Sequence, residues 1–173
     1  KEALKESVNR ILSISVVHEF LSQQGDENID VMEVTKNILQ LIQQNMLDSH
    51  FKLETEFIGE TIILPSKQAS NLALIINELI LNSIEHGFLG RNYGKIGLKI
   101  SQSDEAYIIE LYDNGNGLPE KFFDLPTKSL GLQIVRTLIE GDMNGSFDLY
   151  NDNGVHAKIA IPYKFLMESE VDV

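Results

Sequence analysis

The order of strand-like and helix-like segments limits the fold of this chain more than any other feature. Segments in which apolar and polar residues alternate follow one another in pairs, and single segments with helical apolar spacing separate the pairs. Strict alternation of one strand with one helix would instead indicate a parallel sheet covered on both faces. Paired strands favour a mixed, largely antiparallel sheet with helices on one face. We therefore expect an α+β fold, a two-layer sandwich with an additional N-terminal helix.

The spacing of apolar residues also gives the approximate bounds of these elements. Strands are expected at residues 51–57, 62–64, 95–101, 106–112, 146–150 and 155–161, and helices at residues 1–22, 30–46, 66–86 and 130–139. A polar linker at residues 23–28 separates the first helix from everything that follows. We therefore expect two units, residues 1–24 and residues 29–165.

Composition excludes several classes of protein. The 173 residues carry a net charge of −12, which disfavours binding to nucleic acid or to an anionic membrane surface. The absence of cysteine excludes disulfides, thiol catalysis and zinc–cysteine sites, and it fits a cytoplasmic location. No apolar run reaches the roughly 18–20 residues of a membrane span. Because the chain begins with Lys1 instead of Met, we expect it to be part of a longer protein.

The segment from Asn77 to His86 contains the first candidate functional residues. On a regular α-helix, Glu78, Asn82 and His86 form one polar stripe, because they are spaced four residues apart. The amide oxygen of Asn82 is a suitable ligand for a Mg²⁺ ion that bridges to phosphates. The carboxylate of Glu78, one turn away, could polarise a water molecule or a hydroxyl group. A solvated polar face of a helix explains the same stripe equally well.

Two further segments rich in glycine or small residues follow. Asp113 stands at a strand end, and Gly115 and Gly117 after it would let the backbone approach a flat ligand closely. The Asp113 carboxylate could then accept a hydrogen bond from an amine of that ligand. A plain turn is the alternative, whereas an EF-hand calcium loop matches poorly, because Leu118 and Asp124 occupy its glycine and glutamate positions. The third segment, residues 129–135, begins a helix whose free backbone N–H groups would suit phosphates.

In this order and at these intervals, the three segments resemble the GHKL superfamily, the nucleotide-binding fold of gyrase, chaperone, histidine-kinase and mismatch-repair ATPases. Asn77–Gly87 resembles its N-box, and Asp113–Gly117 and Leu130–Leu132 resemble its two glycine boxes. Within the superfamily, the chain is most similar to sensor histidine kinases of the HisKA_2 (HWE-related) type. Residues 6–19 look like the second dimerisation helix of that type. The resemblance, over about residues 1–162, implies the Bergerat-type ATP-binding fold.

The resemblance also implies a role for each matching residue. Asn82 would bind Mg²⁺ against the phosphates of ATP, and Glu78 would occupy the general-base position of related ATPases. Asp113 would accept a hydrogen bond from the adenine amine, and residues 118–129 would form a lid. The remaining residues implied to bind the nucleotide are Asn77, His86, Gly115, Gly117, Leu130, Gly131 and Leu132. Arg91, Lys121, Lys128 and Arg136 are possible local cations.

By resemblance, the expected function is that of a sensor histidine kinase. The ATP γ-phosphate would pass to a histidine on an upstream dimerisation helix absent from this chain, and from there to the receiver domain of a response regulator. Residues 1–24 would be half of the hairpin that forms a homodimer, so this chain would be incomplete for autophosphorylation. His18 is a weak acceptor candidate, because the usual basic and proline-containing segment does not follow it.

Two departures from the family pattern support an alternative. Glu85 stands where many members have lysine, and Gly154-Val155 stands where a Gly-Thr pair is common. Both changes fit a non-catalytic docking module that binds ATP or ADP at a degenerate site. A serine-directed anti-sigma kinase shares the fold, but the helix expected at residues 1–22 argues against it.

Overall fold

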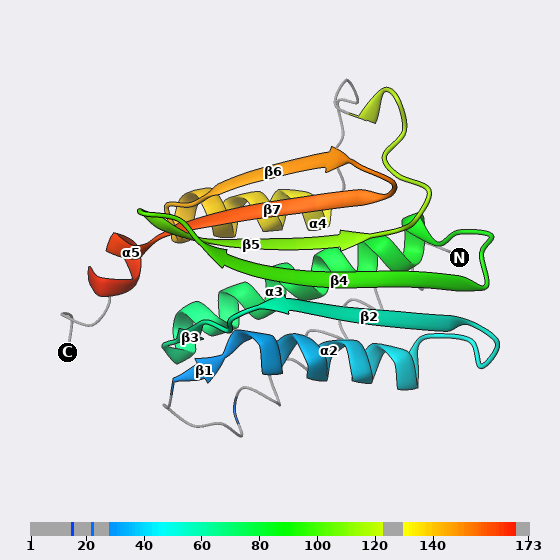
Figure 1. The fold of residues 1–173 in the computed structure, drawn as a ribbon, viewed down its shortest axis with the longest axis horizontal. Coiled ribbons are helices and arrows are strands. Elements are labelled where there is room, and N and C mark those ends of the chain that lie inside the picture. The colour runs from blue at the N-terminus through cyan, green and yellow to red at the C-terminus, as the bar shows by residue number, and fades with distance from the viewer. Residues whose placement is uncertain (1–14, 16–21, 23–27, 123–129, 169–173) are drawn as a thin grey trace.

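The computed structural model describes residues 28–122 and 130–168, together with Ser15 and Ser22. Its strands are β1 (Ile29–Asp30), β2 (Lys52–Gly59), β3 (Ile63–Leu64), β4 (Tyr93–Gln102), β5 (Ala106–Asp113), β6 (Ser146–Asn151) and β7 (Val155–Pro162). Its helices are α2 (Val31–Asn45), α3 (Ser66–Asn82), η1 (Ser83–Gly87), α4 (Leu130–Arg136), η3 (Thr137–Asp142) and α5 (Tyr163–Glu168), as Figure 1 shows. The helix expected at residues 1–22 lies, apart from Ser15 and Ser22, outside the described residues.

Five strands form one mixed sheet in the order β2-β4-β5-β7-β6. The pair β2 and β4 is parallel, and the other three pairs are antiparallel, which confirms the expected mixed and mostly antiparallel sheet. The segment around Ile63, however, does not join this sheet. It forms a separate two-stranded pair, β3 with β1, in which Leu64 lies opposite Ile29. Both side chains are buried, so this short pair joins the helical layer near the start of α2.

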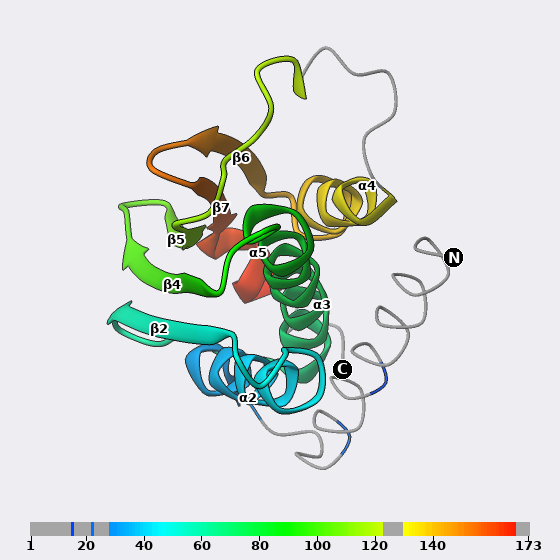
Figure 2. The ribbon, with the colours of Figure 1, turned by 90° about the vertical axis from the view of Figure 1, so that its right-hand side faces the viewer.

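The helices α2, α3 and α4 lie on one side of the sheet, which confirms the two-layer sandwich (Figure 2). Helix α2 begins at its N-cap Asp30, whose carboxylate accepts a hydrogen bond from the Glu33 backbone N–H at 2.9 Å. Helix α3 lies between α2, α4 and the sheet, and Leu72, Ile75 and Ile80 on it are fully buried. The core between the layers therefore surrounds the helix that begins the N-box.

Two helical segments, α3 and α4, each continue into a π-helical turn. The helix expected to reach His86 is α-helical only to Asn82, and the Phe88 N–H then donates to the Ser83 carbonyl, five residues back, at 2.9 Å. The Met143 N–H likewise donates to the Leu138 carbonyl at 3.0 Å, after α4 has ended. A π-turn inserts an extra residue, so the regular spacing assumed for Glu78, Asn82 and His86 ends at Asn82.

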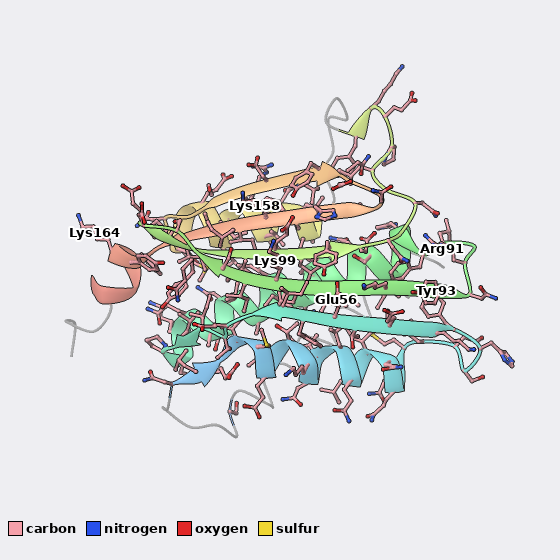
Figure 3. All side chains as sticks on the ribbon, in the orientation of Figure 1. Glu56, Arg91, Tyr93, Lys99, Lys158 and Lys164 are labelled. Carbon is pink, nitrogen blue, oxygen red and sulfur yellow. The ribbon has the colours of Figure 1, made fainter. Side chains whose placement is uncertain are left out.

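The other face of the sheet has no covering helix among the described residues and carries polar and aromatic side chains. In Figure 3, where this face is turned to the viewer, Glu56, Lys99 and Lys158 stand on three of its strands. Alternation along each strand therefore separates an apolar helix-covered face from a polar open face. Among the described helices, none is long and apolar enough to cross a membrane.

Candidate functional site

A cavity of about 320 Å³ lies between the end of α3, the end of β5, the β6–β7 end of the sheet and the segment after Gly117. The predicted site residues that line it are Asn82, His86, Asp113, Gly117 and Leu132. Its further lining is mostly apolar: Leu79, Ser83, Gly87, Leu111, Leu118, Pro119, Phe122, Leu149, Val155 and Ala157. A concave, mostly apolar pocket with a few polar side chains is typical of a small-molecule site.

Asp113 is the most firmly positioned polar group of the cavity. Its side chain is 4 % exposed, and its two oxygens accept hydrogen bonds from three separate parts of the chain. Oδ2 accepts from the Ser83 hydroxyl at 2.7 Å, and Oδ1 accepts from the backbone N–H groups of Gly115 at 2.7 Å and Val155 at 3.2 Å. Because a carboxylate can accept roughly four hydrogen bonds, Oδ2 keeps one direction for a donor on a ligand.

The backbone around Asp113 is packed so closely that glycine is required. A Cβ atom on Gly154 would lie 1.9 Å from the Asp113 carbonyl oxygen, and its φ of +142° disfavours any other residue. A Cβ atom on Gly115 would lie 2.6 Å from the Gly87 carbonyl oxygen. Gly115 therefore packs the loop against Gly87, at the end of the N-box, and its N–H donates to Asp113. Gly117 and Leu118, which follow it, line the cavity instead.

The first two N-box residues are buried, so the solvated polar helix face that was the alternative does not extend to Glu78. Asn77 is 0 % exposed and Glu78 is 2 % exposed, on the part of α3 that lies against the sheet and the other helices. Neither side chain is among the described residues that line the cavity, whereas Asn82, one turn further on, does line it. His86 also lines it and is exposed, on the π-turn.

Asn82 provides a test of whether the site fits a metal-bound anionic ligand. Its Nδ2 atom is buried and has no hydrogen-bond partner among the described residues, so a ligand in the cavity would satisfy it. No group of three or more acidic or histidine side chains that could bind a metal occurs in the part of the chain that the structure describes. A Mg²⁺ ion that keeps its waters and needs one amide oxygen beside phosphates fits this donor set.

The structure describes the glycine box at Leu130–Leu132 but not the residues directly before it. Gly131 and Leu132 are buried at the start of α4, while Leu130 is 64 % exposed and, with Gly131, is not among the described cavity residues. Residues 123–129, which include Ser129 and most of the expected lid, lie outside the described residues. Phosphate binding by this turn stays a prediction.

Of the expected local cations, two have partners among the described residues. Arg136 forms an ion pair with Glu140 at 2.8 Å and lies over the Phe147 ring. Arg91 donates a hydrogen bond to the Asn114 backbone carbonyl, beside the Asp113 loop. Lys121 is exposed next to the cavity residue Phe122, and Lys128 lies outside the described residues. Of the four expected cations, Arg91 therefore contacts the loop that follows Asp113, and Lys121 lies on the segment that lines the cavity.

Three functional contacts were not predicted. Ser83 follows Asn82 directly, and a serine inside an apolar N-box was the signal that could have indicated its bond to Asp113. Val155 stands where a threonine is common, so the site was expected to lack that hydroxyl group. The Val155 backbone N–H nevertheless donates to Asp113. Asn151, at the end of β6, binds the backbone of Leu118, and no sequence pattern indicates that contact.

Comparison with protein families gives two matches. Residues 67–165, more than half of the chain, match the family described as "Histidine kinase-, DNA gyrase B-, and HSP90-like ATPase". Residues 1–46 match the HisKA_2 family, described as "Histidine kinase". The two matches follow each other along the chain without overlap.

Comparison with known proteins gives a similar picture. The sensor histidine kinase PdtaS of Mycobacterium tuberculosis is 33 % identical over 165 residues, which cover 94 % of this chain and 33 % of that protein. The chain thus spans about a third of the length of the curated relative. Among solved structures, the histidine kinase domain of the Erythrobacter litoralis EL346 blue-light-activated histidine kinase superposes with a TM-score of 0.78 at 20 % identity, covering 96 % of this chain and 85 % of that one. The nucleotide-free catalytic domain of histidine kinase ThkA gives a TM-score of 0.61 at 21 % identity, covering 78 % and 94 %. These two structures confirm the fold.

Proposed function

Because the chain belongs to the family of histidine kinase-, DNA gyrase B- and HSP90-like ATPases, we propose that its cavity binds ATP. Within that family, the HisKA_2 match at residues 1–46 favours a sensor histidine kinase. The proposed function is the ATP-binding catalytic part of such a kinase. Residues 29–165 would be the catalytic unit, and residues 1–24, of which the structure describes Ser15 and Ser22, would belong to the dimerisation hairpin.

The observation that supports ATP binding most strongly is the arrangement around Asp113. Three donors orient its carboxylate at an apolar cavity and leave one acceptor direction on Oδ2. Adenine presents a flat apolar ring and an exocyclic amine, so it complements this combination. Leu79, Leu111 and Leu149 would contact the faces of the ring.

At the phosphate end, we propose that Asn82 contributes one amide oxygen to Mg²⁺. When bound, Mg²⁺ neutralises charge on the phosphates. The buried Nδ2 of the same side chain would donate to the ligand. Glu78, one helical turn before Asn82, is proposed as the catalytic residue because it matches the general-base position of related ATPases. His86 lines the cavity, and it and Asn77 are proposed as nucleotide-binding residues.

The proposed reaction is phosphoryl transfer to a histidine. An imidazole nitrogen attacks the γ-phosphorus, the bond between that phosphorus and the β,γ-bridging oxygen breaks, and ADP leaves. The residues named above act by binding and orientation, which are the main demands of this reaction. The phosphoryl group would then pass to the receiver domain of a response regulator, and the intact protein would be a homodimer.

Isothermal titration calorimetry with Mg·ATP tests the nucleotide proposal. We expect saturable binding by the unchanged chain and undetectable binding by Asp113→Ala. Asp142→Ala, at an exposed position on η3, is the control and should bind as the unchanged chain does. No heat of binding with the unchanged chain would contradict the proposal.

A second experiment separates a kinase from a docking module. Labelled ATP is mixed with the chain and a separate hairpin domain that carries an acceptor histidine. Labelling of the hairpin that is lost with Glu78→Gln supports the kinase, whereas binding without labelling supports the docking module. Labelling of the chain alone that is lost with His18→Ala would instead identify His18, which lies outside the described residues, as the acceptor.

A further inference from the structure

Asn151, the last residue of β6, binds both backbone groups of a residue 33 positions earlier in the chain. Its side-chain Oδ1 accepts a hydrogen bond from the Leu118 N–H at 2.7 Å, and its Nδ2 donates to the Leu118 carbonyl at 3.1 Å. One planar amide thus pairs with one residue's backbone as a neighbouring strand would. We call this pair of bonds the Asn151–Leu118 clamp.

Gly117 provides the space that the clamp needs. Its φ is +77°, a conformation that favours glycine, and it directly precedes Leu118. A Cβ atom on Gly117 would lie 3.1 Å from Asn151 Oδ1 and 3.4 Å from Asn151 Nδ2. The second glycine of the Asp113–Gly117 box is therefore explained by the approach of the Asn151 amide, in addition to its place at the cavity.

The clamp lies at the start of the cavity wall. Leu118, Pro119 and Phe122 all line the cavity, and the Phe122 N–H donates to the Pro119 carbonyl at 2.9 Å, which closes a turn. The clamp ties the start of this segment to the sheet at Leu118, and Phe122 at the other end of the turn packs against the core. The position of the wall at Leu118 therefore depends on a side chain of β6.

The turn between β6 and β7, which begins at Asn151, also contacts Asp113, here called the floor of the cavity. Four residues after Asn151, the Val155 N–H donates to Asp113 Oδ1 at 3.2 Å, and the Asp152 N–H closes the turn by donating to the Gly154 carbonyl at 3.1 Å. The turn between β6 and β7 thus binds the wall through a side chain and the floor through its backbone. One short turn therefore contacts both Leu118 and Asp113.

We propose that Asn151 is a positioning residue for the nucleotide, which acts by setting Leu118, Pro119 and Phe122 against the ligand bound at Asp113. The inference rests on the proposed ATP function and adds to it a residue outside the recognised boxes. Asn151 itself is exposed and is not among the described residues that line the cavity. Its loss should therefore affect the wall and the affinity more than the stability of the core.

Two measurements on Asn151→Ala test the proposal. Hydrogen exchange followed by NMR without nucleotide should show the Leu118 amide exchanging at least about tenfold faster, with the amides of Gly115 and Val155 unchanged. Calorimetry with Mg·ATP should show a Kd about fivefold to twentyfold higher, at a nearly unchanged melting temperature. Asn151→Asp should lose as much affinity, because its second oxygen would face the Leu118 carbonyl.

Asn45→Ala is the matched control, because it also removes an exposed asparagine that donates to a backbone carbonyl, that of Leu41 at 2.9 Å, but on α2. It should leave both readouts unchanged. Equal Mg·ATP affinity of Asn151→Ala and the unchanged chain would overturn the inference alone, as would unaltered exchange at Leu118. If the unchanged chain does not bind Mg·ATP at all, the proposed function fails, and the role of the clamp in binding fails with it.

Discussion

At the scale of single residues, the candidate site depends on the three donors that orient Asp113. Ser83, Gly115 and Val155 come from η1, the loop after β5 and the start of β7, so three separate elements must be correctly placed for one carboxylate. Two of the donors are backbone groups that substitution cannot remove directly. The third, the Ser83 hydroxyl, is 6 % exposed and can be removed.

We expect Ser83→Ala to weaken Mg·ATP binding by about threefold to tenfold, because one oxygen of a charged acceptor loses its orienting bond. Calorimetry measures the change. Ser70→Ala is the matched control, since Ser70 also lies on the α3 segment and donates to a backbone carbonyl, that of Ser66 at 2.8 Å. Unaltered affinity in Ser83→Ala would mean that the hydroxyl does not orient Asp113.

Gly154 gives a prediction about stability. Its Cβ position lies 1.9 Å from the Asp113 carbonyl oxygen at a φ of +142°, so Gly154→Ala must displace either β5 or the turn. We expect a loss of about 2–4 kcal/mol in the free energy of unfolding, measured by urea denaturation. Gly141→Ala, where a Cβ would have nothing within 4 Å, should change stability little. Equal stability of the two variants would contradict the described packing.

At the scale of elements, the open face of the sheet carries a connected set of side chains, here called the open-face cluster: Glu56, Glu110, Tyr112, Tyr150 and His156. The His156 ring stacks between the rings of Tyr112 and Tyr150, with both centroid distances 5.2 Å. Glu110 accepts from the Tyr150 hydroxyl at 2.6 Å and lies 2.8 Å from His156 Nδ1. Tyr112 donates to Glu56, on β2. The cluster thus links strands from one edge of the sheet to the other.

The cluster shifts the pKa values of its members in directions that favour the folded state. Burial alone would raise the pKa of Glu110, but the contacts from Tyr150 and His156 outweigh it and lower the pKa below 4.5. The hydrogen bond to Glu110 raises the pKa of Tyr150 from 10.0 to about 12. Burial, with the bond to Glu56, raises the pKa of Tyr112 to about 12. The lowered pKa of Glu110 contributes stability that is lost at acid pH, and the raised pKa values of Tyr112 and Tyr150 contribute stability that is lost at alkaline pH.

Glu110→Gln tests the acid side of this effect. Since the pKa of Glu110 is lower in the folded state, its contribution is present above the ordinary pKa and is lost as the pH falls through the folded value. We expect Glu110→Gln to be about 1 kcal/mol less stable at pH 7 and to lose less stability than the unchanged chain between about pH 5 and 3. Chemical denaturation at several pH values measures both, with the exposed Glu60→Gln as control. Parallel pH profiles of the unchanged chain and Glu110→Gln would contradict the prediction.

The elements were predictable from the sequence where apolar spacing is regular. Helix α2 begins at Asp30 with Val31, Val34 and Ile38 buried as the spacing indicated. The two-residue β1 and the short α5 were missed, because neither is long enough to show a period. The pairing of β3 with β1 was not predicted either, since it forms through a tertiary contact between Ile29 and Leu64 that no local pattern indicates. The π-turn after Asn82 has no sequence period of its own.

At the scale of the whole molecule, a chain with a net charge of −12 is proposed to bind an anion. The cavity donor that the described residues leave for a ligand is neutral: the amide of Asn82. Local dipoles and a bound cation decide binding, while net charge governs solubility and long-range steering. The affinity should therefore depend strongly on Mg²⁺.

We expect the Kd for ATP to rise about tenfold or more when EDTA replaces Mg²⁺, because the uncompensated phosphates are repelled by the acidic chain. Calorimetry in both conditions measures the ratio. Asn82→Ala should weaken binding in Mg²⁺ and reduce the effect of EDTA. A Kd that does not change with EDTA would contradict a role for the metal.

The sequence predicted the motifs of the candidate site better than it predicted which residues line the cavity. Asp113 and Asn82 were found because their residue types and intervals match a chemistry and a family. Leu118 and Phe122 lie within the lid expected at residues 118–129, but the clamp from Asn151 could not be found, because it forms only through tertiary packing. The roles of Glu78 and Asn77 stay predictions, because both side chains are buried and neither is among the described residues that line the cavity.

The central claim is that Asp113 recognises the amine of adenine, and comparing ATP with ITP tests it most directly. ITP has a carbonyl oxygen at C6 in place of the amine of ATP, and its N1 carries a proton as a consequence. We expect the unchanged chain to bind Mg·ATP at least about tenfold more tightly than Mg·ITP, and Asp113→Asn, whose amide can donate to that oxygen, to lose most of this preference. Equal affinity of the unchanged chain for the two nucleotides would contradict the account.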